Sequence, residues 1–351
     1  MSRSLKMHPF YQLMKVRVLE FIRQPEAIFW VYVFPLIMVV ALGLAFRSEP
    51  VESMAVDIQE GPAAETIKES LETDPRFRVQ ISNEQEARRR LRVGKAELIV
   101  VAGESAESKY RYLYDPTRPG SLLARNATDD VLQRAAGRED VIATSDTEVR
   151  DPGSRYIDFL IPGLIGMGLM GGGMWGVGFA IVDMRIRQLL KRFLGTPMKK
   201  NHFLAAMMCS RLLFTIPEIV VLLVFSRLIF GVQNQGCYGI VGLLVILGGF
   251  EFAGIGLLVA SRAKTLEAVS GLMNLVMVPM WIGSGIFFSP DRFPDFVQPF
   301  IKLLPLTPLI SALRRVMLEG VGLSALGTEI SIILGWGLVT FLIALRTFRW
   351  D

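Results

Sequence analysis

Six long apolar runs constrain what this chain of 351 residues can fold into more than any other feature of its sequence. Each run stays hydrophobic for about 18 residues or more, and a helix rises about 1.5 Å per residue, so each can cross the ~30 Å hydrocarbon core of a bilayer. The runs are residues 28–46, 157–182, 204–231, 237–260, 266–288 and 328–345. The sequence therefore predicts a polytopic α-helical membrane protein with six transmembrane helices.

Short basic segments beside the runs predict how the chain is oriented. They precede the first run, follow the second and fourth runs and close the chain, so all lie on one side if six helices alternate. The positive-inside rule makes that side cytoplasmic, and we expect both termini there. Membrane orientation thus explains the net charge of +5 without a nucleic-acid partner. The expected location is the bacterial cytoplasmic (inner) membrane, as a multi-pass protein in contact with its lipids.

The runs divide the chain into parts. Residues 1–27 are expected in the cytoplasm, residues 28–46 form the first transmembrane helix, and residues 47–155 form an extracytoplasmic domain with 17 Lys and Arg against 21 Asp and Glu. Residues 156–351 hold helices 2–6, with a cytoplasmic loop at 185–202 and short outer-face helices at 289–325. The first run is longer than the core of a usual signal peptide, so we expect an uncleaved anchor.

Residues 8–24 form an amphipathic helical pattern before the first run. One face carries Phe10, Tyr11, Met14, Val18, Phe21 and Ile22. A helix of this kind lies in the membrane surface. Pro25 is expected to end or bend it before the first transmembrane helix.

The extracytoplasmic segment 47–155 is predicted to be an α/β domain. The segments MAVDIQ, RFRVQIS, AELIVVAG and KYRYLYD are strand-like and alternate with helical segments. One helix is expected to begin after Asn83 and to end near Gly94. Cys209 and Cys237 lie in or beside apolar runs, so no disulfide framework is expected in this domain.

The second run contains a glycine stripe, formed by Gly168, Gly172 and Gly176. Small residues at this spacing allow close helix packing in membranes. The pattern favours packing within one subunit, and a subunit interface or a moving gate are alternatives.

Residues 289–325 contain two amphipathic helices that are too short to span a bilayer. Thr307 is expected to cap the second of them, with Pro308 at its first position and Gly320 at its end. These helices either lie at the outer surface or dip into the membrane and return.

Glu218 and Glu251 lie within apolar runs, where a charge is costly. They form a possible path for a cationic substrate. Alternatively, they pair with Arg, Ser or backbone groups inside the bundle, and Arg211, seven residues from Glu218, is one such partner.

The loop at 185–202 begins as a short basic helix with one apolar stripe. The stripe is formed by Ile186, Leu189, Leu190, Phe193 and Leu194. Gly195 permits the helix to end, and Pro197 prevents its continuation. From composition alone, the loop either fixes topology or forms a contact surface for a cytoplasmic protein.

Several segments, in the order of the six helices, resemble permease subunits of the ABC-2 class of ABC transporters. They are FIRQPEAIFWVYVFPLIM, YIDFLIPGLIGMGLM, LLKRFLGTPMKKNHFLAAMMCSR and GSGIFFSPDRFPDFVQPFIKLLPLTPLISALRRVMLEG. The large external domain between helices 1 and 2 is similar to that of the exporter branch, which includes multidrug permeases. Polysaccharide-exporting relatives usually lack so large an insertion.

The resemblance implies that ATP and Mg²⁺ bind a separate ATPase subunit, so no cofactor or metal is expected on this chain. The sequence agrees, because it contains no G-x-x-x-x-G-K-[ST] loop. In the family, the surface helix before helix 1 and the loop between helices 2 and 3 contact the ATPase. The residues expected to couple to it are Arg17, Glu20, Arg23, Arg187, Lys191, Arg192, Gly195, Thr196 and Pro197.

The resemblance also implies a second permease, as a homodimer or with a sister subunit, and is compatible with a periplasmic adaptor. The expected substrate is a small amphipathic, drug-like or lipid-like molecule that is exported. A polysaccharide or glycolipid is the alternative substrate.

Two other classes of protein fit the sequence less well. An intramembrane enzyme needs convergent polar groups, but His8 and His202 are far apart in sequence and no H-E-x-x-H or G-x-S-x-G motif is present. We therefore expect a transporter subunit with no catalytic residues. A membrane scaffold that displays the external domain without transporting is the remaining alternative.

Overall fold

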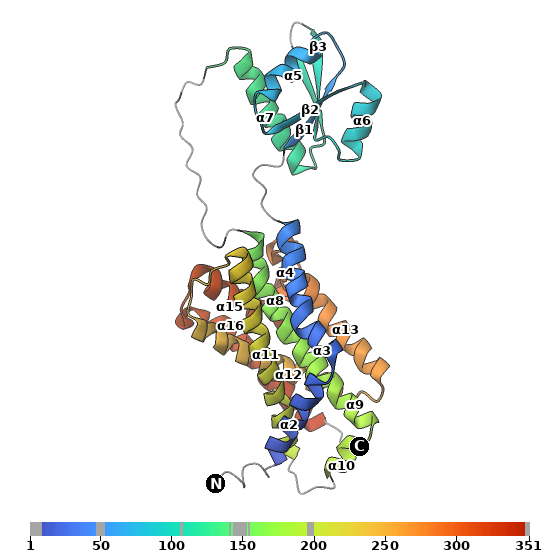
Figure 1. The fold of residues 1–351 in the computed structure, drawn as a ribbon, viewed down its shortest axis with the longest axis vertical. Helices are drawn as coiled ribbons and strands as arrows, with labels where there is room; N and C mark the ends of the chain where they lie inside the picture. Colours follow the sequence, from blue (N-terminus) through green and yellow to red (C-terminus); the bar gives the residue numbers. More distant parts are fainter. Residues whose placement is uncertain are drawn as a thin grey trace. The chain divides into compact units, whose positions relative to one another are not determined.

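The computed structural model describes residues 9–46, 53–105, 108–139, 142, 153, 155–194 and 200–347. The chain divides into two compact units. Residues 48–149 form the domain unit, and residues 1–47 together with 150–351 form the membrane unit. Figure 1 shows a sheet with helices in the first and a bundle of helices in the second.

Six helical spans in the membrane unit are long and apolar enough to cross a bilayer, which confirms the predicted fold class. The spans are Pro25–Ala45, Tyr156–Ile186, Ala205–Phe230, Tyr238–Ala260, Leu266–Gly283 and Leu323–Thr347. The surface helix α2 (Pro9–Ile22) precedes them. The first span stops and the second begins at one end of the bundle, which we call the Tyr156 end. We call the opposite end the Arg187 end.

The spans are built from the following elements. The first comprises α3 (Pro25–Ile28), η1 (Phe29–Val33) and α4 (Phe34–Ala45), and the second α8 (Tyr156–Gly173), η2 (Met174–Phe179) and α9 (Ala180–Ile186). After α10 (Leu189–Leu194) come α11 (Lys200–Phe230), α12 (Tyr238–Ala260) and α13 (Leu266–Gly283). The chain then forms η3 (Pro290–Arg292), α14 (Gln298–Leu303), α15 (Leu306–Glu319), η4 (Leu323–Leu326) and α16 (Gly327–Thr347).

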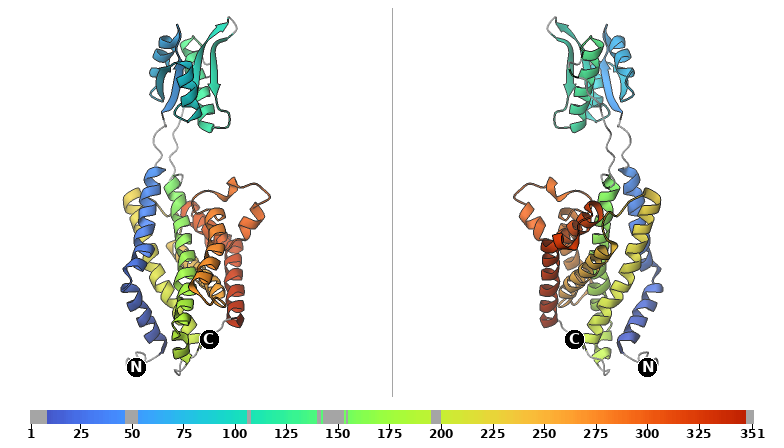
Figure 2. Two further views of the ribbon diagram at one scale, coloured as in Figure 1. Left: turned by 90° about the vertical axis from the view of Figure 1, so that its right-hand side faces the viewer. Right: turned by 90° about the vertical axis from the view of Figure 1, so that its left-hand side faces the viewer.

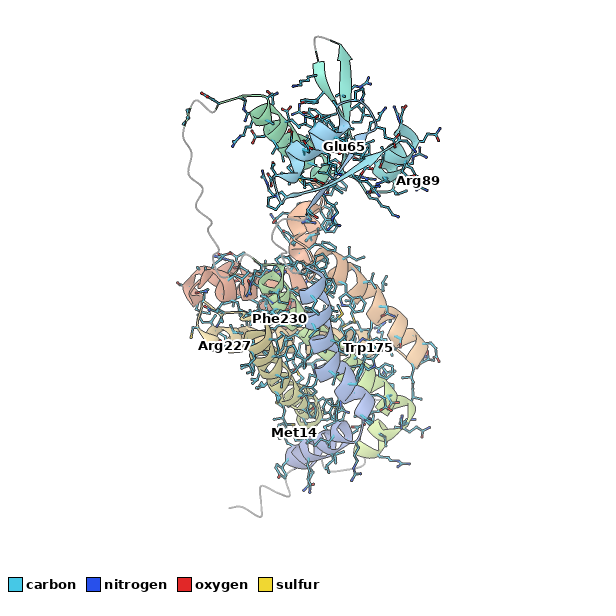
Figure 3. All side chains as sticks on the ribbon, turned by 45° about the horizontal axis from the view of Figure 1, so that its top comes forward. Met14, Glu65, Arg89, Trp175, Arg227 and Phe230 are labelled. Carbon is cyan, nitrogen blue, oxygen red and sulfur yellow. The ribbon has the colours of Figure 1, made fainter. Side chains whose placement is uncertain are left out.

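The second and fourth spans form the centre of the bundle. In their most apolar stretches, 61% and 67% of residues are buried, against 17–28% in the other four spans. Their backbones touch where α8 meets α12, because a β-carbon at Gly173 would overlap Phe252 and one at Gly256 would overlap Gly173. Close packing of small residues therefore joins the two central helices. The outer spans carry many exposed apolar side chains, such as Leu228 and Leu275. Trp175 of the second span is also exposed (Figure 3).

Each of the first two spans contains a π-helical turn, η1 and η2. A π turn widens the helix and shifts backbone hydrogen bonds to the fifth residue, so carbonyl groups near it become available to other donors. Such turns are frequent at functional sites, and the one at Met174–Phe179 lies beside the surface helix, as described below.

The helices α14 and α15 form a hairpin that enters the bundle from the Tyr156 end (Figure 2). Leu306 and Ile310 pack against Gly166, and Leu309 packs against Gly248. Each glycine lies ten residues into its own helix, which corresponds to a depth of about 15 Å. The turn of the hairpin therefore reaches about halfway across the hydrocarbon core, and the chain dips in rather than lying on the surface.

Further contacts hold the hairpin at this depth. Trp336 Nε1 donates to the carbonyl of Leu303 at 3.0 Å, and Gln235 N donates to the carbonyl of Met317 at 2.9 Å. Gly320 ends α15 with φ +69°, as expected. The predicted capping role of Thr307 is wrong, because α15 starts at Leu306, two residues before the predicted start at Pro308, and the Thr307 hydroxyl donates to Ser284 at 3.0 Å.

The domain unit is a sheet between two layers of helices, with strand order β2-β1-β3-β4. Strand β1 pairs in parallel with β2 and β3, and β4 is antiparallel to β3. The elements are β1 (Met54–Gln59), α5 (Ala64–Glu72), β2 (Phe77–Ser82), α6 (Glu84–Arg92), β3 (Leu98–Ser105), β4 (Ser108–Tyr114) and α7 (Pro119–Ala135). Val56 and Ile58 face α5 and α7, whereas Ile99 and Val101 face α6.

Local signals in the sequence set the ends of α6. The Asn83 side chain accepts a hydrogen bond from Glu86 N at 2.9 Å, and Gly94 has φ +73° just after the helix. Both predictions are confirmed.

On the inner face of α6, Arg90 Nε lies 2.8 Å from Asp57 Oδ2, and Asp57 is 1% exposed. Burial raises the pKa of the Asp57 carboxyl above its ordinary value, although Arg90 opposes the shift.

Replacing Arg90 by alanine is expected to lower the unfolding free energy of the domain unit by about 3 kcal/mol at neutral pH, because it leaves a buried carboxylate unpaired. A folded-state pKa above the unfolded value means that this group's contribution is fully present in acid and is lost as the pH rises through the folded pKa. The loss on replacement should therefore shrink in acidic buffer. Urea-dependent proteolysis of the full-length protein measures it.

The matched control for this prediction is Arg88→Ala on the same helix. Arg88 and its partner Glu84 have side chains 60% and 56% exposed, so the change should cost at most about 0.5 kcal/mol. Equal effects of the two replacements would contradict the role given to the Asp57–Arg90 pair.

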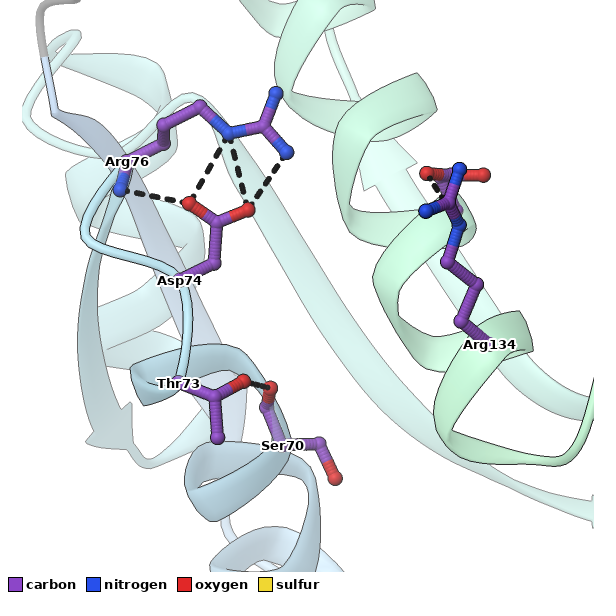
Figure 4. A network of polar contacts seen from close by, with 6 residues as sticks. Ser70, Thr73, Asp74, Arg76 and Arg134 are labelled. Carbon is purple, nitrogen blue, oxygen red and sulfur yellow. Dashed lines mark hydrogen bonds and ion pairs between the residues drawn. The ribbon is translucent and has the colours of Figure 1, made fainter. Parts of the chain in front are cut away.

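The domain unit also carries a surface hollow of about 530 Å³ between α5 and α7. Beside it, Asp74 accepts four hydrogen bonds from the guanidinium and backbone of Arg76, and Thr73 donates to the Ser70 carbonyl at 2.7 Å (Figure 4). The Arg76 hydrogen bonds lower the pKa of Asp74. These contacts fix the loop between α5 and β2.

Candidate functional site

Helix α2 and the Arg187 ends of the second and third spans enclose a cavity of about 650 Å³. Its lining residues come from α2 and the segment that follows it, from α9 and the turn after it, and from α10 and α11: Leu13, Val16, Arg17, Leu19, Glu20, Arg23, Gln24, Asp183, Met184, Arg187, Leu189, Phe203, Ala206 and Met207. Four of the residues expected to couple to a partner, Arg17, Glu20, Arg23 and Arg187, thus surround one cavity. Two segments far apart in the sequence meet there.

The cavity has an apolar base and a charged rim. Phe203 and Met207 are buried at its base, whereas Val16 on α2 is 58% exposed. On the rim, Arg17 pairs with Glu20 and Arg187 pairs with Asp183, each at 2.9 Å, and Arg23 adds a third positive charge. A concave apolar patch with a polar rim is typical of sites that receive a side chain from another protein.

Arg17 also links the surface helix to the second span. Its Nη2 atom donates to the carbonyl of Gly176 at 3.1 Å, within the π turn η2. The Arg17 side chain is only 16% exposed, so it points into the bundle rather than toward solvent. Phe21 adds an apolar contact of the same helix, because its ring stacks on Phe214 of α11 with centroids 4.2 Å apart. Helix α2 is therefore fixed to two spans at once.

The helix predicted after the second span is divided into two. Gln188 adopts φ +55°, so α9 ends at Ile186 and α10 starts at Leu189. In α10, Leu190 is buried, and Lys191 and Arg192 are exposed, where they are free to contact another protein. The expected residues Gly195, Thr196 and Pro197 lie outside the described part of the chain.

Arg185 is a connecting residue at this end that the sequence analysis did not single out. Its Nη1 atom donates to the carbonyls of Ala260 and Ala263 at 2.9 and 2.8 Å, at the end of α12. A basic side chain near the last carbonyls of a helix is favourable. The second span is thereby joined to the fourth at the Arg187 end.

The glycine stripe of α8 and η2 holds charged side chains of α11. A β-carbon at Gly168 would overlap the carboxylate of Glu218, and one at Gly172 would overlap the guanidinium of Arg211. Arg211 Nη2 lies 3.1 Å from Glu218 Oε2, and both side chains are 9% exposed. A β-carbon at Gly176 would lie 3.1 Å from Arg211 Cδ. The stripe thus makes room for a buried ion pair, while the closest α8–α12 backbone contact uses Gly173.

The two glutamates within spans differ in their surroundings. Glu218 pairs with Arg211, and the hydroxyl of Tyr32 nearby donates to the Phe214 carbonyl at 3.1 Å. Glu251 is 1% exposed, and neither of its carboxylate oxygens has a hydrogen-bond partner among the described residues. Glu218 therefore has a counter-charge, whereas none is present for Glu251 among the described residues.

The described residues contain no group of three or more His, Cys, Asp or Glu side chains placed to hold a metal ion. The contacts of the site are mechanical connections between helices. A surface cavity at the Arg187 end is joined through Arg17, Arg185 and the Arg211–Glu218 pair to the central spans.

The chain belongs to the ABC-2 family of transporter proteins, because the model of that family matches residues 25–346. The match covers every described span and confirms the resemblance seen in the sequence.

Comparison with curated proteins gives three relatives of the same kind. The chain is 25% identical over 173 residues to ABC transporter G family member 20 of Dictyostelium discoideum, covering 49% of this chain and 24% of that protein. It is 25% identical over 176 residues to the linearmycin resistance permease protein LnrN of Bacillus subtilis, covering 50% and 46%. It is 25% identical over 202 residues to the inner membrane transport permease YadH of Escherichia coli K12, covering 57% and 75%.

The chain thus spans less than half the length of the first two of these relatives. One of these relatives is named as an inner membrane permease, and the six described spans of this chain fit a multi-pass membrane protein.

Proposed function

We propose that the chain is the permease subunit of an exporter driven by ATP hydrolysis on a separate ABC ATPase subunit, which binds the ATP and Mg²⁺. The cavity at the Arg187 end carries this proposal, because it gathers α2 and the α9–α10 segment into one surface with an apolar base and a charged rim. We place this end, and with it both termini, in the cytoplasm on the basis of the basic segments there.

In this proposal, force from the ATPase reaches the membrane through rigid elements. The second span is a helix of 31 residues, about 46 Å long, and extends past a ~30 Å core toward the cavity. Arg17 fixes α2 to it, and Arg185 fixes it to α12. A partner that binds α2 and α10 together would tilt these spans as a rigid body. Rigid-body rotation is one of the known forms of switching between conformations.

The likeness to a linearmycin resistance permease supports a small amphipathic, drug-like or lipid-like substrate that is exported. A polysaccharide or glycolipid remains the alternative substrate. The first and last spans are only 17% buried, which supports a second permease against them, either another copy or a sister subunit. A periplasmic adaptor would contact the domain unit. A scaffold without transport is the alternative function.

The experiment that tests this proposal is reversal of the rim charge by the double change Arg23→Glu and Arg187→Glu. The rim then carries one positive and four negative charges instead of three positive and two negative. Like charges placed against a matched partner surface cost several kcal/mol, so recovery of the ATPase subunit with the tagged permease should fall at least about tenfold. Quantitative co-purification from membranes measures this.

The matched control for the rim is Arg227→Glu, an exposed arginine near the Tyr156 end of α11. It changes charge as strongly per residue but lies far along the helix from the cavity. Undiminished recovery of the ATPase with the rim variant, or equal loss with the control, would count against the proposed contact surface.

A further inference from the structure

Glu251 is a buried acid that does not line the cavity at the Arg187 end. It lies thirteen residues into α12, at a depth of about 20 Å from the Tyr156 end. The residue is 1% exposed, and both carboxylate oxygens lack a hydrogen-bond partner within residues 155–194 and 200–347, which surround it. Such a group needs an explanation, because buried polar atoms without partners are rare in folded proteins.

The neighbours of Glu251 on α12 show what surrounds it. On one side, α16 approaches so closely that a β-carbon at Gly337 would lie 3.5 Å from the Glu251 α-carbon. One turn further, a β-carbon at Gly254 would lie 2.9 Å from the Thr340 hydroxyl. On the other sides, the residues beside Glu251 meet Leu309 of α15, Leu169 of α8 and Leu212 of α11. None of these groups is charged.

The charged groups on the helices packed against α12 are engaged elsewhere or lie near helix ends. Arg211 of α11 is paired with Glu218 on the side of α8, and Asp158 of α8 is paired with Arg155. The remaining charged groups are Asp183 and Arg185 of α9, Lys200 and Arg227 of α11, Glu267 of α13, Arg314, Arg315 and Glu319 of α15, and Glu329 and Arg346 of α16. No counter-charge for Glu251 is therefore present among the described residues.

An ionised carboxylate in this environment would cost far more than a neutral one. Burial of an unpaired ion costs many kcal/mol in a medium of low dielectric constant, and such groups become neutral instead. Gly337 and Thr340 of α16 pack closely on α12 at Glu251 and Gly254. The packed arrangement of α12 and α16 therefore accommodates the acid form, which carries a proton on one carboxylate oxygen.

We propose that Glu251 is a proton-binding site at the contact of α12 with α16. It holds a proton while the two helices are packed and releases it when they separate. On release, the carboxyl O–H bond breaks, the proton passes to water that enters the gap, and a carboxylate with one negative charge remains. Movement of α16 away from α12 is thereby coupled to the pH of the compartment that supplies the water, independently of any ATPase partner.

The test is infrared difference spectroscopy of the full-length protein in liposomes, between neutral and alkaline buffer. A protonated carboxyl has a carbonyl stretch separate from that of a carboxylate. We expect this band in the native protein at neutral pH, its loss in Glu251→Gln, and its retention in Glu218→Gln. Glu251→Asp should shift the band rather than remove it. A spectrum unchanged by Glu251→Gln overturns the proposal.

A pair of glycine variants on α16 tests the dependence on packing. A β-carbon at Gly337 would already touch the Glu251 α-carbon at 3.5 Å, so the longer side chain of Gly337→Leu is expected to push α16 away from Glu251, whereas a β-carbon at Gly335 would meet no atom within 4 Å. We expect the Glu251 band to disappear at neutral pH in Gly337→Leu and to persist in Gly335→Leu. Persistence in both variants overturns the release step. If the native protein instead shows a carboxylate band from Glu251 that changes when tetraalkylammonium ions are added, Glu251 is a site for a cationic substrate and not a proton site.

Discussion

Replacing Arg211 by methionine is expected to lower the unfolding free energy of the membrane unit by about 3–5 kcal/mol. The change leaves the Glu218 carboxylate, 9% exposed, without its partner 3.1 Å away, and removal of one member of a buried ion pair has a cost of this size. The glycine stripe increases the effect, because Gly168 and Gly172 supply no side chain to fill the space. Denaturant unfolding in detergent, followed by tryptophan fluorescence, measures the loss.

A double-mutant cycle separates pairing from packing in this prediction. Glu218→Leu combined with Arg211→Met should recover most of the loss, because a buried ion pair replaced by apolar residues of similar volume is often neutral or stabilising. Arg227→Met on the same helix, where the arginine is exposed, should change stability by at most about 0.5 kcal/mol. Single losses that simply add in the double variant would refute a direct Arg211–Glu218 interaction.

Replacing Arg17 by methionine is expected to uncouple transport from ATP hydrolysis. A hydrogen bond from a charged donor contributes about 1.5–3 kcal/mol, and Arg17 uses one to fix α2 to the Gly176 carbonyl. Without it, motion of α2 no longer moves the second span, and transport into vesicles should fall at least about tenfold. The ATPase partner should still co-purify, because the apolar base of the cavity and the exposed rim arginines Arg23 and Arg187 are unchanged.

Arg23→Met is the control for uncoupling. Arg23 also lines the cavity, but no hydrogen bond from its side chain to another span is present among the described residues. This variant should weaken partner recovery modestly and leave the ratio of transport to hydrolysis intact. If Arg17→Met loses transport and partner recovery in proportion, Arg17 is a contact residue and not a link between α2 and the second span.

The spans were predictable because each depends on the composition of a continuous stretch. An apolar run of sufficient length has no soluble alternative, whatever its neighbours. The same is true of local signals such as Asn83, whose side chain caps the helix that begins at the next residue. The prediction for Thr307 was wrong because a proline fits any position of the first helical turn, and Pro308 is the third residue of α15, which begins at Leu306.

The site was less predictable, because its contacts join residues far apart in the chain. The spacing of Gly168, Gly172 and Gly176 indicates only that something approaches closely. Whether that is a backbone or a side chain depends on α11, which supplies Arg211 and Glu218. The inward position of Arg17 depends on a π turn around Gly176, and no residue pattern in that stretch predicts a π turn. The grouping of Arg17, Glu20, Arg23 and Arg187 followed only from the resemblance to a family.

The hairpin of α14 and α15 also sets an order for biogenesis. Neither helix is long enough to leave the translocon as an independent span. Its turn rests on Gly166 and Gly248, which are synthesised earlier, but the Leu303 carbonyl needs the indole of Trp336, which is synthesised later. The hairpin is therefore completed only after the final helix has entered the bilayer. In a nascent chain that stops before α16, the Leu303 carbonyl in the turn lacks its indole partner and is exposed to lipid. We expect membrane proteases to degrade such a chain.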